Sequence, residues 1–279
     1  MQARQVRRSP FAGSWYPGEP RELAAMVARL LASAPVSEGR GRLVALISPH
    51  AGLAYSGPIA AAGYRLLEPG AFESVVLLGP SHRVAFDGLA ACSEGAFATP
   101  LGLVEIDAQL ARSFLDATAR ARPMPEVHAN EHCLEMQLPF LQHVLPNARI
   151  LPVIMGAQTA GNIEAAASAM VRAVSASSVP VLLVASSDLS HYESRERARE
   201  LDSQVLECLE RFDPRALEDL LAFERGHACG GGPMVAVMMA AHELGARAAR
   251  VLAYGDSGDV TGETDGVVGY ASAAMVEGA

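Results

Sequence analysis

The stretch Leu43-Val44-Ala45-Leu46-Ile47-Ser48-Pro49-His50-Ala51-Gly52 decides the fold, because an unbroken apolar run stops in it at Pro49 and Gly52. A short run of aliphatic residues bounded by turn formers predicts a strand that is buried on both faces. His50 then lies just past the carboxyl end of that strand. Open α/β sheets bind their ligands at this end of their strands.

Two further stretches repeat this pattern. The run Ser74–Leu78 is followed by Gly79-Pro80-Ser81-His82, and the run Val179–Ser186 is followed by Ser187-Asp188-Leu189-Ser190-His191. An Ala-rich segment over Gly57–Leu67 predicts a helix between the first two strands, and the order strand, helix, strand favours parallel pairing. The sequence therefore predicts an α/β fold whose central, largely parallel but mixed sheet is flanked by helices.

Other segments complete this fold. Helical spacing of the apolar residues predicts a helix over Pro20–Ala34 and another that opens at Glu131. Short runs over Gly88–Cys92 and Gly102–Ile106 predict two strands or a hairpin. No repeat, low-complexity tract or long linker divides the chain, so residues 1–279 are expected to form a single domain.

The charge pattern excludes several classes of protein. The 279 residues carry a formal net charge of −9, and all 22 basic residues are arginine, because the chain has no lysine. A lysine Schiff base and a P-loop lysine are therefore both ruled out. The arginines are scattered rather than gathered into a stripe, so we expect no nucleic-acid partner.

The cysteines and the apolar segments predict a cytoplasmic protein. Cys92, Cys133, Cys208 and Cys229 lie far apart without CxxC spacing, which suits a reduced protein better than a disulfide scaffold or a zinc ribbon. The basic amino terminus runs into Ser9-Pro10-Phe11 without the apolar region of a secretory signal. No apolar stretch is long enough for a transmembrane helix, so we expect no membrane association.

A histidine after one strand is weak evidence by itself, because such residues are more often hydrogen-bonded loop residues than ligands. The repeated pattern strengthens it. His50, His82 and the pair Asp188 and His191 each follow a buried strand, and parallel pairing brings such strand ends to one edge of a sheet. We therefore expect these side chains to form one site.

Cys229 lies in the glycine-rich stretch Gly226-His227-Ala228-Cys229-Gly230-Gly231-Gly232-Pro233, which precedes an Ala/Met-rich helix. One interpretation is a small apolar residue in a tight turn, as buried thiols commonly are. The other is a thiolate favoured by a nearby metal or by the helix amino terminus, with glycines that allow close approach of the backbone. The strand-end histidines favour the second interpretation.

The stretch Glu131-His132-Cys133-Leu134-Glu135 matches no zincin pattern. On a helix, Glu131 and Glu135 would share one face. One interpretation is a polar first turn whose acids are stabilised by the helix dipole. The other is that Glu131, His132 or Glu135 orients the ligand histidines through hydrogen bonds. Both interpretations stay open here, with His132 a stronger candidate than His128.

Six motifs, in order along nearly the whole chain, resemble those of the MEMO family, whose prokaryotic branch is known as AmmeMemoRadiSam system protein B. No single motif would suffice, but six in order make the resemblance specific. The motifs are Ala12-Gly13-Ser14-Trp15-Tyr16-Pro17, Ser48-Pro49-His50-Ala51-Gly52, Leu78-Gly79-Pro80-Ser81-His82, Asn130-Glu131-His132 with Glu135-Met136-Gln137-Leu138-Pro139, Ser186-Ser187-Asp188-Leu189-Ser190-His191, and Cys229-Gly230 with Pro233.

The resemblance implies a fold similar to that of class III extradiol dioxygenases, with the site at one end of the sheet. It also implies a metal position formed by His50, His82 and Cys229, with Asp188 and His191 nearby. Extradiol enzymes hold Fe(II) with two histidines and a carboxylate. Cys229 takes the place of that carboxylate here, and a thiolate changes metal preference and redox behaviour.

The leading hypothesis is a metal-binding protein, with Fe(II) the first choice and copper or zinc behind it, that performs redox or oxygen-dependent chemistry on an unknown small molecule. His191 and Asp188 would move protons, and Glu131 and His132 would orient the ligands. One alternative is a zinc-dependent hydrolase with Asp188 or Glu131 as the base. Another is a non-enzymatic scaffold that binds a peptide or a partner. The resemblance further implies a functional association with a radical SAM protein and an AMMECR-type protein.

Overall fold

A mixed sheet forms the centre of the molecule. The computed structural model describes residues 5–35, 41–223 and 226–278, and in these residues the sheet has nine strands. Eight of them follow the order β10 (His191–Glu193), β12 (Val267–Glu277), β2 (Leu43–Ser48), β9 (Val181–Ser186), β3 (Ser74–Pro80), β8 (Arg149–Met155), β4 (Leu89–Ala91) and β7 (Ala121–Pro123), and β11 (Ala246–Asp256) pairs with β12.

The middle of the sheet is parallel and its flanks are mixed. β2, β9, β3 and β8 all run in the same direction, whereas β12 pairs antiparallel with β2, and β4 pairs antiparallel with β8. The middle strands are continuous apolar runs because helices cover both of their faces. This arrangement confirms the predicted α/β fold with a mixed sheet flanked by helices.

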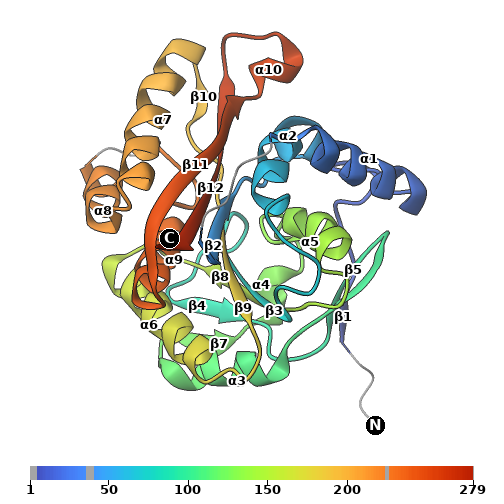
Figure 1. The fold of residues 1–279 in the computed structure, drawn as a ribbon, viewed down its shortest axis with the longest axis vertical. Coiled ribbons are helices and arrows are strands. Elements are labelled where there is room, and N and C mark those ends of the chain that lie inside the picture. The colour runs from blue at the N-terminus through green and yellow to red at the C-terminus, as the bar shows by residue number, and fades with distance from the viewer. Residues whose placement is uncertain (1–4, 36–40, 224–225, 279) are drawn as a thin grey trace.

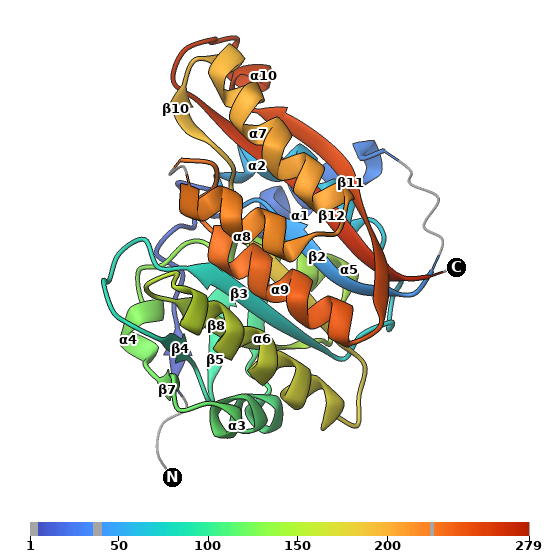
Figure 2. The ribbon, with the colours of Figure 1, turned by 90° about the vertical axis from the view of Figure 1, so that its left-hand side faces the viewer.

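Helices cover both faces of this sheet (Figures 1 and 2). One face packs against α1 (Pro20–Ser33), α2 (Leu53–Tyr64) and α5 (Leu138–Val144), and the other against α3 (Ala108–Ala117), α6 (Ala160–Ser175), α7 (Arg195–Glu210), α8 (Pro214–Phe223) and α9 (Gly231–Glu243). Side chains along a strand alternate between the two faces, so that Val75 and Leu77 belong to one core and Val76 and Leu78 to the other.

A small second sheet lies beside the main one. It contains β1 (Val6–Arg7), β5 (Ala96–Thr99) and β6 (Gly102–Glu105), in that order. β5 and β6 form an antiparallel hairpin, whereas β4 joins the main sheet beside β8. The alternative of a hairpin between the predicted strands at Gly88–Cys92 and Gly102–Ile106 is therefore wrong. The partner of the second strand in the hairpin is Ala96–Thr99, which lies next to the turn.

The helix predicted to open at Glu131 begins later. Glu131 and His132 are in irregular structure, a single 3₁₀ turn covers Glu135–Gln137, and α5 starts only at Leu138. Oε1 of Glu131 accepts hydrogen bonds from the backbone N–H groups of the two residues that follow it. Such local side-chain bonds compete with helix formation, which explains why the helix starts later in the chain than predicted.

The remaining short helices are α4 (Pro125–His128) and α10 (Gly258–Thr261). Within the part of the chain that the structure describes, no helix combines the length and the apolar character needed to cross a bilayer. The basic amino terminus considered above extends into residues 1–4, which lie outside the described residues.

Candidate metal centre

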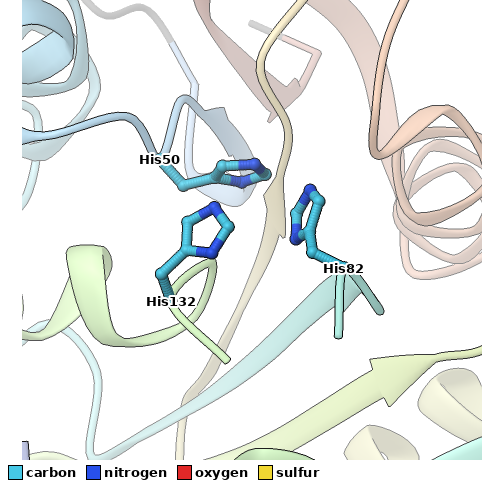
Figure 3. Close-up of side chains that lie close together, drawn as sticks. All are labelled: His50, His82 and His132. Carbon is cyan, nitrogen blue, oxygen red and sulfur yellow. The ribbon is translucent and has the colours of Figure 1, made fainter. Parts of the chain in front are cut away.

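Three imidazole rings meet at the carboxyl edge of the parallel strands. His50 follows β2 and His82 follows β3, and both strands pair in parallel with β9, which lies between them. His132 comes from the irregular segment before α5. One ring nitrogen from each of these histidines lies within 4.8 Å of the others, and Figure 3 shows the rings facing one another. The sheet topology therefore brings together the two strand-end histidines that the sequence predicted.

His50 is almost fully buried, with 1% of its surface exposed. Its Nδ1 lies 2.9 Å from Oγ of Ser186, and its Nε2 lies 3.2 Å from Sγ of Cys229. Burial lowers the pKa of His50 well below its usual value, and the neighbouring His132 and His82 lower it further. His50 is therefore neutral, which is the form in which imidazole binds metals.

His82 is the most accessible of the three rings, with 26% of its side chain exposed. Its Nδ1 lies 2.9 Å from Oε1 of Glu131, and its backbone N–H donates to Oε2 of the same residue at 2.7 Å. A carboxylate accepts hydrogen bonds, so Nδ1 carries a proton, and in the neutral ring Nε2 keeps the lone pair. Glu131 thus orients His82 as metal-binding histidines are commonly oriented.

Glu131 stays ionised although only 2% of it is exposed. Burial alone would raise its pKa, but hydrogen bonds from His132, His82 and the backbone N–H of His82 lower the pKa far below the usual range. A buried carboxylate with several such donors holds its charge. The structure thus places Glu131 against His82, one of the histidines that it was predicted to orient.

His132 lies between Glu131 and an aromatic wall. Its Nδ1 is 3.2 Å from Oε1 of Glu131, and its ring centroid is 4.5 Å from that of Trp15 and 4.5 Å from that of His82. The sequence assigned His132 a role in orienting the ligands, and the structure places it close enough to share a metal with His50 and His82.

Cys229 lies next to Nε2 of His50, the ring nitrogen that does not face Ser186. The backbone N–H of Asp188 donates to its Sγ at 3.3 Å, and burial raises the pKa of the Cys229 thiol, with the charge of Asp188 adding to the effect. A Cβ on the next residue, Gly230, would lie 2.5 Å from the carbonyl oxygen of Ser186. Glycine at position 230 therefore allows the loop to bring Cys229 against the strand end.

Asp188 and His191 lie at the end of β9. Asp188 accepts hydrogen bonds from the backbone N–H of His50 at 2.6 Å and of Ala51 at 3.3 Å. Burial raises its pKa, which these two bonds partly offset. His191 is partly exposed, and its Nδ1 lies 2.7 Å from the carbonyl oxygen of Leu189. Since a carbonyl only accepts, Nδ1 of His191 carries a proton, and in the neutral ring the lone pair lies on Nε2.

Glu135 does not reach the histidines. It is fully buried and accepts hydrogen bonds from Arg7, Ser9 and Tyr16, all of which belong to the amino-terminal segment. Arg7 also donates to the carbonyl oxygen of Glu131 at 2.7 Å. The idea that Glu135 faces the site beside Glu131 is therefore wrong, because the two residues do not share a helical face.

Sequence reasoning missed three side chains at this centre. Ser186 and Gln137 lie behind His50, and the ring of Trp15 packs against that of His132 at an interplanar angle of 45°. All three lie within the family motifs, yet nothing in those motifs indicates which side chains meet across the fold.

The donor set suits a transition metal. Imidazole binds iron, copper and zinc. Sγ of Cys229 lies 3.2 Å from Nε2 of His50, but Cys229 is not a member of the group formed by the three histidines. A second group, formed by His82, Glu131 and Cys133, also brings its ligand atoms within 4.8 Å of one another, and in it Sγ of Cys133 donates to the carbonyl oxygen of Pro80. Both groups include His82, so the described residues place these candidate ligands in one region of the molecule.

Comparison with known proteins identifies the family of the chain. A family model described as Memo-like protein matches residues 7–274. The MEMO1 family protein MK0963 of Methanopyrus kandleri is 34% identical over 277 residues, which cover 96% of this chain and 98% of that protein. A MEMO1 family protein of Aeropyrum pernix is 38% identical over 279 residues, covering 95% of this chain and 98% of its own.

A solved structure shows a similar fold. An uncharacterized protein of Escherichia coli K12, JW3007, matches with a TM-score of 0.52 and 13% identity, over 83% of this chain and 99% of its own. At this identity the match concerns the fold alone. The family match covers nearly the whole chain, and each curated relative named above exceeds 30% identity over nearly its full length. The chain therefore belongs to the Memo-like family.

Proposed function

We propose that this protein binds iron through His50, His82 and Cys229 and uses it in redox or oxygen-dependent chemistry on a small molecule. The observation that carries this proposal is the convergence of the imidazole rings at the strand ends, with Nε2 of His50 3.2 Å from Sγ of Cys229. Two imidazoles and one thiolate form a ligand set that leaves coordination positions open.

The polar side chains around this centre would have different roles. Glu131 holds His82 with Nε2 free for a metal, and Asp188 holds the backbone N–H of His50. His191 keeps a bare Nε2 and is partly exposed, so it is suited to accept a proton from a substrate hydroxyl. A bound iron would supply the electron transfer and a site for oxygen, which side chains lack.

Metal loading tests this proposal. The protein is loaded anaerobically with Fe(II), desalted and assayed for metal, beside the double variant His50→Ala with His82→Ala. We expect near-stoichiometric iron in the wild type and loss of it in the variant, because two of the three ligands are gone. The matched control is His143→Ala with His242→Ala, which removes two exposed histidines of α5 and α9 that belong to neither candidate metal group.

Two results would contradict the proposal. One is equal iron retention in the His50/His82 variant and the wild type. The other is loss of iron in the His143/His242 control as well, since this would show that binding is not local to the centre.

A zinc-dependent hydrolase is the second candidate, and the presence of His132 beside His50 and His82 favours it. Three protein ligands with one open position are typical of catalytic zinc. Asp188 would then be the base, because Glu131 is already engaged by His82 and His132. Zinc in the purified protein, with no oxygen uptake across a panel of substrates, would favour hydrolysis over redox chemistry.

A further inference from the structure

Two fully buried polar side chains lie behind His50. Ser186 ends β9, and Gln137 ends the 3₁₀ turn before α5. Oγ of Ser186 lies 2.9 Å from Nδ1 of His50 and 2.8 Å from Nε2 of Gln137. Neither side chain has any exposed surface. Buried polar groups need partners, so each donor and acceptor here can be assigned.

The orientation of Gln137 is fixed by its neighbours. Its Nε2 lies 3.0 Å from the carbonyl oxygen of Pro49 and 3.4 Å from that of Cys133. Carbonyl oxygens only accept, so the amide nitrogen must face them. The amide oxygen of Gln137 then accepts from the hydroxyl of Tyr64 at 2.8 Å. The amide nitrogen carries two hydrogens, and its two shortest contacts are the 2.8 Å one to Oγ of Ser186 and the 3.0 Å one to Pro49, so Gln137 donates to Ser186.

The direction of the Ser186 hydroxyl follows from this. Its Oγ lies 2.7 Å from the carbonyl oxygen of Cys133, so the hydroxyl hydrogen points there. Its lone pairs are left to accept one hydrogen bond from Gln137 and one from His50. His50 must therefore carry its proton on Nδ1, which leaves the lone pair on Nε2, the nitrogen that faces Cys229.

We propose that Ser186, which accepts a hydrogen bond from the Gln137 that Tyr64 orients, is a positioning residue that sets the tautomer of His50 so that Nε2 is free to bind metal. This inference rests on the proposed metal function only for the use of that nitrogen. Nδ1 of His82 donates to the carboxylate of Glu131, whereas Nδ1 of His50 donates to the neutral hydroxyl of Ser186. Both ligands thus present Nε2.

Removal of the Ser186 hydroxyl should change the tautomer. Without an acceptor at Nδ1, the proton of His50 moves to Nε2, where Sγ of Cys229 at 3.2 Å can accept it. The nitrogen that binds metal is then blocked. A side chain with a purely structural role would affect stability without changing which ring nitrogen carries the proton.

The test uses nitrogen NMR of the metal-free, full-length protein labelled at its histidine rings, with His50 assigned from the signals lost in His50→Ala. We expect a protonated Nδ1 and a bare Nε2 in the wild type. In Ser186→Ala we expect a measurable fraction with the proton on Nε2 and Fe(II) affinity about 10- to 100-fold lower. Ser272→Ala is the matched control, since Ser272 is also fully buried in the same sheet and its Oγ has no hydrogen-bond partner in the described residues.

Several outcomes would overturn the inference. A wild-type spectrum with the proton on Nε2 would do so without any variant, which covers the case that Ser186→Ala does not fold. An unchanged tautomer and affinity in Ser186→Ala would also do so, as would equal losses in Ser272→Ala. If the tautomers behave as stated but no metal binds to the wild type, the assignment of Ser186 stands and the proposed metal function fails.

Discussion

Glu131 has more contacts at the centre than any other acid there, and they explain why its side chain is buried. One carboxylate oxygen meets the ring nitrogens of His82 and His132, and the other accepts the backbone N–H of His82. A buried charge is stable only when such donors surround it. Glu131 thus fixes the direction of His82 and the position of His132 together.

The first prediction concerns Glu131→Gln, which keeps the size of the side chain and removes its charge. An amide donates as well as accepts, so His82 no longer has a fixed tautomer. We expect metal affinity to fall about 10- to 100-fold, as for other partners of metal-binding histidines. Competition with a chromophoric chelator measures it. Glu126→Gln, an exposed acid on α4, is the control. Equal affinities for Glu131→Gln and wild type would contradict this role.

At the scale of single residues, the sequence predicts the candidate ligand histidines better than the side chains that are hydrogen-bonded to them. His50 and His82 could be predicted because each ends an apolar run, and the run itself marks the strand end. Ser186 could not be paired with His50, which lies 136 residues away, or with Gln137, which lies 49 residues away. Such contacts depend on how strands and loops meet, which no local pattern contains.

At the scale of elements, the amino-terminal segment holds the loop that carries Glu131. Arg7 of β1 donates to the carboxylate of Glu135 at 2.5 Å and to the carbonyl oxygens of His128 and Glu131. Ser9 and Tyr16 bond to the same carboxylate. Residues 129–134, between α4 and the 3₁₀ turn, are irregular, so these bonds substitute for the backbone pairing of a helix or a strand.

The second prediction concerns this contact. Arg7→Ala leaves Glu135 as a fully buried charge without its cation, and removal of one partner of a buried pair costs about 3–5 kcal/mol of unfolding free energy. Urea denaturation measures the change. The control is Arg42→Ala, which breaks the exposed pair with Glu277 and should cost about 1 kcal/mol or less. Equal costs for the two variants would show that Arg7 does not hold the loop.

Elements were predictable where apolar residues alone decide them. The strands at Leu43–Ser48 and Val181–Ser186 match the predicted runs because helices bury them on both faces. The helix from Glu131 was wrong because the carboxylate of Glu131 bonds to its own neighbouring N–H groups. Polar side chains that bond locally change the backbone without changing the apolar spacing.

At the scale of the whole molecule, both cores depend on one sheet, and buried ionisable groups link its stability to pH. His128 has 1% of its surface exposed, and its Nε2 lies 3.1 Å from the carbonyl oxygen of Ala90. Burial lowers the pKa of His128 from 6.5 to about 4. The folded protein therefore keeps His128 neutral at pH values at which the unfolded chain binds a proton.

The third prediction follows from the sign of this shift. Between pH 6.5 and about 4 the unfolded chain binds more protons at this site than the folded chain, so stability falls as pH falls. The loss from His128 alone is about 3 kcal/mol once pH is below both values. Above pH 6.5 the shift contributes nothing, because His128 is neutral in both states.

Urea unfolding of the metal-free protein at pH 7 and pH 5 checks this prediction. His128→Gln should show a smaller pH dependence than the wild type, because glutamine does not titrate and its amide can still donate to Ala90. His143→Ala, which removes an exposed histidine, should keep the wild-type dependence. A pH dependence in His128→Gln as steep as in the wild type would rule out His128 as its source.

The central claim is that His50 and His82 hold a metal together with Cys229. The most direct measurement is an anomalous-scattering map from crystals grown without added metal, recorded above and below the iron absorption edge. The account predicts one strong peak within bonding distance of Nε2 of both histidines and of Sγ of Cys229, present above the edge and much weaker below it. No peak at that position, or a peak that none of these three atoms approaches, would contradict it.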